Sequence, residues 1–318
     1  MGNELKNFNR NLVIYVNAID LKILLLLNNK EMKIEFYSFW GGFSNQSDYP
    51  GHVKYYEELF KDSEYDIIQV YSVFGAAPQS LNTDPKILTI QITGEACYKD
   101  PSKYNLSLIP KVSSNQVPAS QVITSYFAAY DMHIQNNIHK LTEKRTLGLK
   151  TKFCNFIVSN GGPGLRKDFF LELSKHKFVD SCGRFLKNWT GPPAPPFSTD
   201  EYHTFLNDWR FMICFENQSQ DYYLTEKFMN AYLGGCIPIY WGCPQVSSLF
   251  NKKAFLLLED TGTDSINKLI NQIMELENNP ELYAQMHSEP LFVNNEIAKE
   301  FTMQYIKDQL QGNNQLQC

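Results

Sequence analysis

The chain has 318 residues, 43% of them hydrophobic and 20% charged, which is the composition of a folded protein large enough for two domains. Its formal net charge is −5 and no run of lysine or arginine stands out, which argues against nucleic acid as the main partner. A local cationic pocket for one small anion is fully compatible with that total charge.

Residues 1–31 are interpreted as a lead segment that is dispensable for the fold, because the first clean strand pattern begins after Met32. The most apolar part of this segment, residues 23–27, is far too short to span a bilayer, and Asp20 and Lys22 lie just before it. We therefore expect neither a signal peptide nor a transmembrane segment. The expected location is the cytoplasm, with peripheral attachment at a membrane surface as an alternative.

The first half of the chain alternates apolar strands with helical segments, which predicts an α/β domain over residues 32–150. A helix is expected over residues 55–60 and strands over residues 33–39, 66–71 and 87–93. A polar stretch interrupted by prolines (residues 102–120) and an aromatic run (residues 123–130) follow. A charged helix over residues 135–150 is expected to join the two halves.

The same alternation restarts over residues 151–318. Strands are expected over residues 153–158, 178–181, 211–215, 237–241 and 254–258, with helices beginning near Leu165, Thr199 and Thr225 and others towards the C-terminus. Two consecutive α/β units with a cleft between them is the architecture that this order predicts.

Residues 211–242 are the most informative segment, because they read as strand, polar loop, helix and strand. Such a unit is a right-handed parallel crossover, and ligands of parallel sheets bind at the carboxyl ends of the strands. That end carries a dense group of polar and aromatic side chains: Glu216, Asn217, Tyr222, Tyr223, Glu226 and Lys227. A crossover that only fills a core needs no such density, so a ligand site is predicted here.

Arg166 and Lys227 each lie in the first turn of a predicted helix, where backbone N–H groups and the helix dipole favour an anion. For Arg166 alone, a solvated helix residue is an equal reading. A cation at Lys227 is unfavourable unless an anion compensates it, whereas Glu226 suits the first turn on dipole grounds alone. Two adjacent helix ends of this kind fit a diphosphate, to which Tyr223 or its neighbour can offer a hydroxyl.

Glu95 follows Gly94 directly after the apolar strand that ends at residue 93, so its carboxylate is expected to face the cleft. An ordinary loop glutamate is the alternative reading. No Asp-x-Asp motif is present and the six histidines are scattered, so no divalent metal is predicted and protein cations must neutralise the phosphates. The seven cysteines contain no CxxC pair, which predicts free thiols.

Residues 215–246, FENQSQDYYLTEKFMNAYLGGCIPIYWGCPQV, closely resemble the signature of the α1,3/4-fucosyltransferases, glycosyltransferase family 10, which use GDP-fucose. The resemblance extends to KFCNFIVSN, LRKDFFLELSK and VDSCGRFLKN in the second half, and to MKIEFYSFWGGF and ITGE in the first. It runs from about residue 32 to residue 305 in the family's order. Without a membrane anchor, the chain is similar to the soluble bacterial members.

The resemblance implies a GT-B fold, with an acceptor-binding domain over residues 32–150 and a GDP-fucose-binding domain over residues 151–318 that includes the C-terminal helices. By this likeness Glu95 is the general base that deprotonates the acceptor, and Arg166 and Lys227 are the cations on the GDP phosphates. Glu226 matches a carboxylate that contacts the nucleotide on its ribose. Asn217 and Tyr223 match the polar groups around the sugar and diphosphate. The family needs no bound metal.

The predicted reaction is inverting transfer of fucose to the 3-hydroxyl of GlcNAc or Glc in an oligosaccharide or glycan such as N-acetyllactosamine or lactose. An α1,4 linkage, another GDP-sugar donor, and a non-catalytic sugar-nucleotide-binding protein on the same scaffold stay open. Trp40, Phe43 and residues 95–104 are candidates for stacking under the acceptor sugar. The oligomeric state is not predicted.

Overall fold

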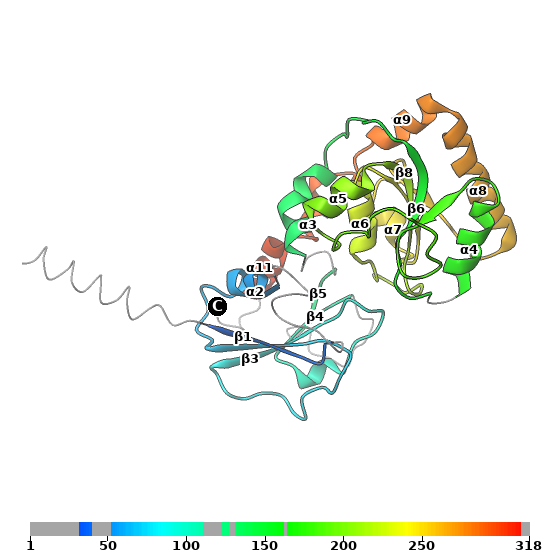
Figure 1. The fold of residues 1–318 in the computed structure, drawn as a ribbon. Coiled ribbons are helices and arrows are strands. Elements are labelled where there is room, and N and C mark those ends of the chain that lie inside the picture. The colour runs from blue at the N-terminus through cyan, green and yellow to red at the C-terminus, as the bar shows by residue number, and fades with distance from the viewer. Residues whose placement is uncertain (1–31, 40–51, 111–121, 127–130, 162–163, 313–318) are drawn as a thin grey trace, which may run out of the picture.

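The structure is a computed structural model that describes residues 32–39, 52–110, 122–126, 131–161 and 164–312. The lead segment, residues 1–31, lies outside the described residues. Trp40 and Phe43, the candidates for contact with the acceptor, also lie outside them. Two α/β units are arranged side by side, and the helices that connect them lie between the two sheets (Figure 1). Within the described part of the chain, no helix is both long and apolar enough to cross a membrane.

The first sheet has five parallel strands in the order β1-β2-β3-β4-β5. Their bounds are β1 Lys33–Tyr37, β2 Ile67–Tyr71, β3 Ile87–Ile92, β4 Leu106–Ile109 and β5 Val122–Thr124. The register is in phase, since Lys33 pairs with Ile67 and Ile67 with Ile87. A short 3-10 helix, η1 (Pro101–Lys103), lies between β3 and β4. The sheet confirms the three strands expected from the sequence, and β4 and β5 are additional.

One hydrophobic core covers the first sheet, and two helices from opposite ends of the chain contribute to it. Helix α2 (His52–Leu59) supplies the fully buried Tyr55 and Tyr56, and helix α11 (Met303–Gly312) supplies Ile306 and Leu310. Figure 1 shows α11, in red, beside the blue α2. Chain order places α11 in the predicted domain of residues 151–318, whereas its buried side chains belong to the first core.

The second sheet also has five parallel strands, in the order β10-β9-β8-β6-β7. They are β6 Lys152–Phe156, β7 Val179–Ser181, β8 Trp209–Phe215, β9 Ile237–Trp241 and β10 Leu256–Leu257. The chain adds β7 on one side of β6 and then places β8 on the other side. The carboxyl ends of β6 and β8 therefore form the topological switch point at which ligands of doubly wound sheets bind.

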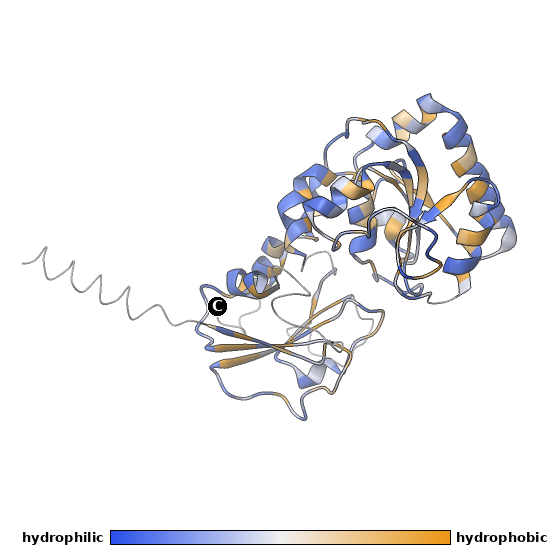
Figure 2. Ribbon diagram, in the orientation of Figure 1, coloured by the Kyte–Doolittle hydropathy of each residue, from blue (hydrophilic) through white to orange (hydrophobic). Residues whose placement is uncertain are grey.

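Helices cover both faces of the second sheet, and each face has its own core. The helices are α4 Gly164–Ser174, α5 Asp200–Leu206, α6 Glu226–Leu233, α7 Val246–Leu249, α8 Thr263–Asn278, α9 Pro280–Ser288 and α10 Asn295–Lys299. The residues of α6 belong to one core and those of α4 and α8 to the other. In Figure 2 the ribbons of α4 and α8 carry both hydrophobic and hydrophilic residues, and their buried apolar residues belong to the core that they share with the strands. Such two-sided burial explains why these strands are almost continuously apolar.

The connection between the halves corrects one prediction, because the expected helix over residues 135–150 is wrong in extent. Helix α3 (Met132–Asn137) continues as a 3-10 helix, η4 (Ile138–Leu141), and residues 145–151 have no regular secondary structure. Arg145 explains the break. Its Nη1 donates to the carbonyls of Tyr232 at 2.7 Å and Cys236 at 2.9 Å, which draws the chain onto the end of α6.

Candidate functional site

A cavity of about 730 Å³ opens at the carboxyl ends of β6 and β8, at the switch point of the second sheet. Its walls are residues 157–160 after β6, the first turns of α4 and α6, the loop after β7, and a proline-rich segment, residues 193–197. Four residues predicted from the sequence line it together: Arg166, Asn217, Glu226 and Lys227. The cavity is therefore the place where the crossover segment and the Arg166 helix end meet.

Arg166 is buried, with 2% of its surface exposed, so it is not the solvated helix residue of the alternative reading. Its Nε and Nη2 donate to the carbonyl of Phe215 at 3.1 and 2.7 Å, at the end of β8. Burial lowers the pKa of the guanidinium, and the nearby Glu216 carboxylate opposes that effect. A guanidinium fixed in this way presents its remaining N–H groups in a set direction, which suits a bound anion.

Lys227 lies between two carboxylates and one hydroxyl. Its Nζ is 3.5 Å from Glu216 Oε2 and 3.6 Å from Glu226 Oε1, and it donates to Thr225 Oγ1 at 2.9 Å. Burial acts to lower the pKa of this ammonium, but the two carboxylates outweigh it and the pKa is raised. The charge of Lys227 is therefore maintained at neutral pH although the side chain is largely enclosed.

Glu216 is the charged residue that sequence reasoning left without a role. Its side chain is fully buried, and Oε1 accepts the backbone N–H of Thr225, the N-cap residue of α6, at 2.8 Å. Burial raises the pKa of Glu216, while the Lys227 ammonium opposes that shift. Gly242 has a φ of 149°, and a Cβ there would lie 2.5 Å from Glu216 Cγ, so only glycine lets β9 end beside this carboxylate.

Arg184 and Lys187 are two further cations of the cavity that the sequence analysis did not single out. Both are exposed and lie in the loop after β7, at the same edge of the sheet as Arg166. The signal that could have revealed them is the Cys-Gly-Arg-Phe-Leu-Lys turn directly after a predicted strand. With Arg166 and Lys227 they bring four cations to one cavity, against the single lining carboxylate of Glu226.

The first half meets this site through the turn after β3. Asn217 Nδ2 donates to Glu95 Oε2 at 3.0 Å, and Gln218 Nε2 donates to the carbonyl of Ala96 at 3.1 Å. The Tyr223 hydroxyl lies 3.4 Å from the carbonyl of Gly94. Tyr223 is therefore at the contact between the halves, behind the cavity rather than on its lining. Glu95 is brought to the cavity edge, because Asn217 itself lines the cavity.

Glu95 is held by a local turn as well as by the other half of the protein. Its N–H donates to Thr93 Oγ1 at 3.0 Å, and the Thr93 hydroxyl donates to the Glu95 carbonyl at 2.9 Å. This turn fixes the backbone while the half-buried side chain points towards the second half. A carboxylate in that position can accept a proton from a hydroxyl group bound between the two sheets.

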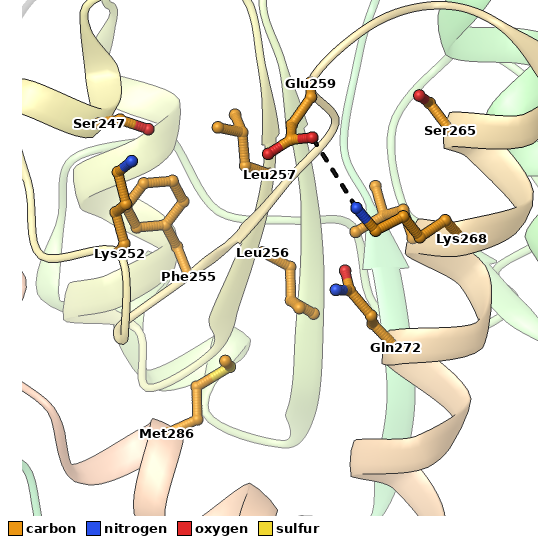
Figure 3. A pocket seen from close by; sticks show the side chains of 11 residues that line it. Ser247, Lys252, Phe255, Leu256, Leu257, Glu259, Ser265, Lys268, Gln272 and Met286 are labelled. Atoms are coloured by element: carbon orange, nitrogen blue, oxygen red, sulfur yellow. Dashed lines mark ion pairs between the residues drawn. The ribbon is translucent and has the colours of Figure 1, made fainter.

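A second cavity, of about 230 Å³, lies at the outer edge of the second sheet beside β10 and α8 (Figure 3). An ion pair between Glu259 Oε2 and Lys268 Nζ, 4.0 Å apart, crosses it, and both side chains are mostly exposed. None of the predicted site residues lines this cavity. It is not at the switch point of the sheet. In the described ranges, no group of three histidine, cysteine or acidic residues could hold a metal ion.

Two parallel α/β units with a cavity at the sheet edge where they meet define the fold class as GT-B, as expected from the sequence. A solved α1,3-fucosyltransferase with GDP-fucose superimposes with a TM-score of 0.64 at 18% identity, over 89% of this chain and 90% of that one. Residues 147–303 match the model of glycosyltransferase family 10 (fucosyltransferase), C-terminal part. Residues 147–303 are therefore a domain of this family, as the motifs of the second half indicated.

The curated relatives match part of the chain. The alpha-(1,3)-fucosyltransferase of Helicobacter pylori is 32% identical over 138 residues, which is 43% of this chain and 27% of that protein. GDP-fucose protein O-fucosyltransferase 3 of Xenopus tropicalis is 34% identical over 130 residues, 39% of this chain and 27% of that protein. The alignments thus span about a quarter of the length of either relative.

Proposed function

We propose that this protein is an inverting fucosyltransferase that takes GDP-fucose as donor and an oligosaccharide or glycan as acceptor, forming an α1,3 linkage to GlcNAc or Glc. The observation that carries the proposal is the position of Glu95 at the edge of a cavity lined by Arg166 and Lys227. One carboxylate opposite a cationic cavity is what glycosyl transfer from a nucleoside diphosphate sugar requires.

In the proposed reaction, the Glu95 carboxylate takes the proton of the acceptor hydroxyl. The hydroxyl oxygen forms a bond to the anomeric carbon of fucose while the bond from that carbon to the β-phosphate oxygen breaks. The electron pair of the broken bond leaves with GDP, whose developing charge Arg166 and Lys227 stabilise. Because the oxygen attacks opposite to the leaving group, the configuration inverts. The transition state resembles an oxocarbenium ion.

The remaining predicted residues have supporting roles in this proposal. Glu226 accepts hydrogen bonds from the ribose hydroxyls, and Asn217 connects the donor cavity to Glu95 at 3.0 Å. Tyr223 supports the site indirectly, because its hydroxyl lies at the contact between the halves and not on the cavity lining. The charges on the diphosphate are neutralised by protein cations in this scheme, so no divalent metal is required.

A second acceptor class is a hydroxyl on a protein side chain, supported by the similarity to GDP-fucose protein O-fucosyltransferase 3. The test is a panel of nucleotide sugars offered with N-acetyllactosamine, with lactose and with a serine- or threonine-containing glycopeptide or peptide. We expect transfer from GDP-fucose to a glycan, with product linkage analysis giving α1,3. Transfer from another GDP-sugar, α1,4 product, or peptide product alone would each replace one part of the proposal. Binding without transfer or hydrolysis would favour the non-catalytic alternative.

A further inference from the structure

A chain of hydrogen bonds runs from the cavity to the connection between the two halves. Asn230 of α6 lines the cavity and is 1% exposed, and its Nδ2 donates to Ser198 Oγ at 2.9 Å. The Ser198 hydroxyl donates to Oδ2 of Asp131, the residue directly before α3. The other oxygen of Asp131 accepts the N–H groups of His133 and Ile134 at 3.0 and 3.1 Å, which caps α3.

The same chain continues on the other side of Asn230. Its Oδ1 lies 2.7 Å from Nε2 of His203 on α5, and His203 Nδ1 lies 3.2 Å from Nε2 of His133. Because Asn230 donates to Ser198 through Nδ2, its Oδ1 must accept, so His203 Nε2 carries the hydrogen. His203 Nδ1 then accepts from His133. Every bond in the chain points in one direction, towards the carboxylate of Asp131.

An ionised carboxylate accepts hydrogen bonds and cannot donate one, so Asp131 determines this direction. Without it, the Ser198 hydroxyl can donate to Asn230 instead, and the Asn230 amide and both imidazoles can reverse. Asn230 lies three residues after Lys227 and four after Glu226, so all three share one face of α6 and all three line the cavity. A reversal at Asn230 therefore changes which atoms face a bound ligand.

Ser198 also holds the proline-rich segment. It has a φ of 57°, in the left-handed region that a serine adopts at an energetic cost, and its two hydrogen bonds to Asp131 and Asn230 oppose that cost. Pro196 and Phe197, directly before it, form part of the cavity wall. The position of this wall thus depends on the same bonds that fix the direction of the chain.

The pKa of Asp131 lies close to neutral pH. Burial raises its pKa to about 6, and the Ser198 hydroxyl bond opposes this shift, as do the capping N–H groups. Burial lowers the pKa of His203 to about 4 and also lowers that of His133, so both imidazoles are neutral at neutral pH. The other charged groups that influence these three are Glu226 of α6, Asp200 and Glu201 of α5 and Lys140 of η4.

We propose that Asp131 is a positioning residue for the donor site. Its carboxylate fixes the direction of the hydrogen bonds through Ser198 and Asn230 and so holds the proline-rich segment and the Asn230 amide against a sugar nucleotide. The inference rests on the proposed function, since it names a residue that shapes the donor cavity without touching the reacting atoms. It also connects that cavity to the segment that joins the two halves.

The test compares Asp131→Asn with Ser198→Ala. Asparagine is as good an N-cap as aspartate, and Ser198→Ala leaves the cap untouched, so both variants preserve α3 and break the directed chain. We expect each to raise the KM for GDP-fucose roughly 5- to 10-fold with kcat nearly unchanged. The double variant should be no worse than either single one, because both act through one bond. Asp131→Ser, which keeps the cap but shortens the acceptor, should resemble them.

The pH profile separates positioning from a general loss of packing. The KM of the wild-type protein for GDP-fucose should rise as the pH falls through about 6, where Asp131 gains a proton, and the Asp131→Asn profile should be flat there. GDP-fucose is the right probe because its diphosphate, substituted at both ends, does not titrate in this range, whereas the terminal phosphate of GDP does.

Amide hydrogen exchange of residues 197–203 provides a readout that needs no ligand. Faster exchange in both variants is expected, with unchanged exchange in α8. The inference is overturned if KM and exchange match the wild type, or if the variants lose thermal stability while KM and its pH profile stay the same. If the wild-type protein does not bind GDP-fucose, the proposed function fails. The exchange of residues 197–203 then still decides whether Asp131 positions this wall.

Discussion

The carboxyl ends of the two sheets differ in how they hold charge. In the second half, Arg166 and Glu216 are buried and Lys227 is fixed between carboxylates, so the site is built before any ligand arrives. In the first half, Glu95 is half-buried on a short turn, and a side chain from the other half holds it. A diphosphate needs fixed charges around it, whereas a general base needs access to a hydroxyl that arrives with the acceptor.

The difference follows from how each sheet is covered. The second sheet is packed on both faces by its own helices, which allows charges to be enclosed at its edge. Among the described residues, the first sheet has one core, completed by α11 from the end of the chain. In the proposed function, donor binding and proton transfer therefore fall to halves whose sheets are covered differently. Four experiments test this difference between the two halves.

Glu95→Gln should have the largest effect. Removing the base is expected to lower kcat about 10²- to 10⁴-fold, with GDP affinity unchanged because the cations are untouched. Transfer assays and isothermal titration calorimetry measure the two quantities. The matched control is Glu57→Gln on the exposed side of α2. Near-normal transfer by a folded Glu95→Gln protein would show that Glu95 is not the general base.

Leu310→Ala tests whether the first core depends on the end of the chain. Leu310 is 1% exposed, so its truncation should lower the free energy of unfolding of the first half by about 2–5 kcal/mol. Urea unfolding followed by amide exchange of β2 and β8 measures each half separately. Gln311→Ala, on the exposed side of α11, is the control. Equal destabilisation of both sheets would show that the halves do not unfold independently.

Lys227→Met tests the built site of the second half. Loss of the ammonium should weaken GDP binding about 10- to 100-fold and should also destabilise the fold, because Glu216 and Glu226 lose their shared partner. Calorimetry with GDP and thermal unfolding are the measurements, with the exposed Lys253→Met as the control. Unchanged GDP affinity would take Lys227 out of the phosphate site.

His287 gives the smallest effect, through pH. Burial, with the Arg145 guanidinium nearby, lowers its pKa to about 3, below the value of 6.5 for an unfolded chain. Since the unfolded state then binds more protons, this group's contribution is complete above pH 6.5 and is lost as the pH falls towards 3. The loss is at most about 1.4 kcal/mol for each pH unit.

Urea unfolding at neutral and acidic pH compares the wild type with His287→Gln. The glutamine amide can still donate to the Gly235 carbonyl, which His287 Nε2 meets at 3.0 Å, but it does not titrate. The variant should therefore lose less stability on acidification than the wild type. An identical pH dependence of the two proteins would mean that the pKa of His287 is the same in the folded and unfolded states.

Local patterns predicted the crossover of the second half well, because β8, α6 and β9 carry unbroken apolar periodicity between a polar loop and a glycine pair. They failed where a partner distant in the sequence decides the conformation. The helix expected through Arg145 ends early because carbonyls 87 and 91 residues away accept from its guanidinium. Strand β4 was missed because its four buried residues sit inside a polar, proline-interrupted stretch.

The sequence by itself determined two α/β units and the family of residues 147–303, and it predicted a ligand site after β8, since each of these depends on periodicity or on a contiguous motif. Tertiary structure alone decided that Glu216 is enclosed beside Lys227, that Glu95 meets Asn217, and that Ser198 connects Asp131 to Asn230. The members of these last two groups are 32 to 122 residues apart. Burial and hydrogen-bond direction depend on which segments the fold brings together, and no local pattern carries that information.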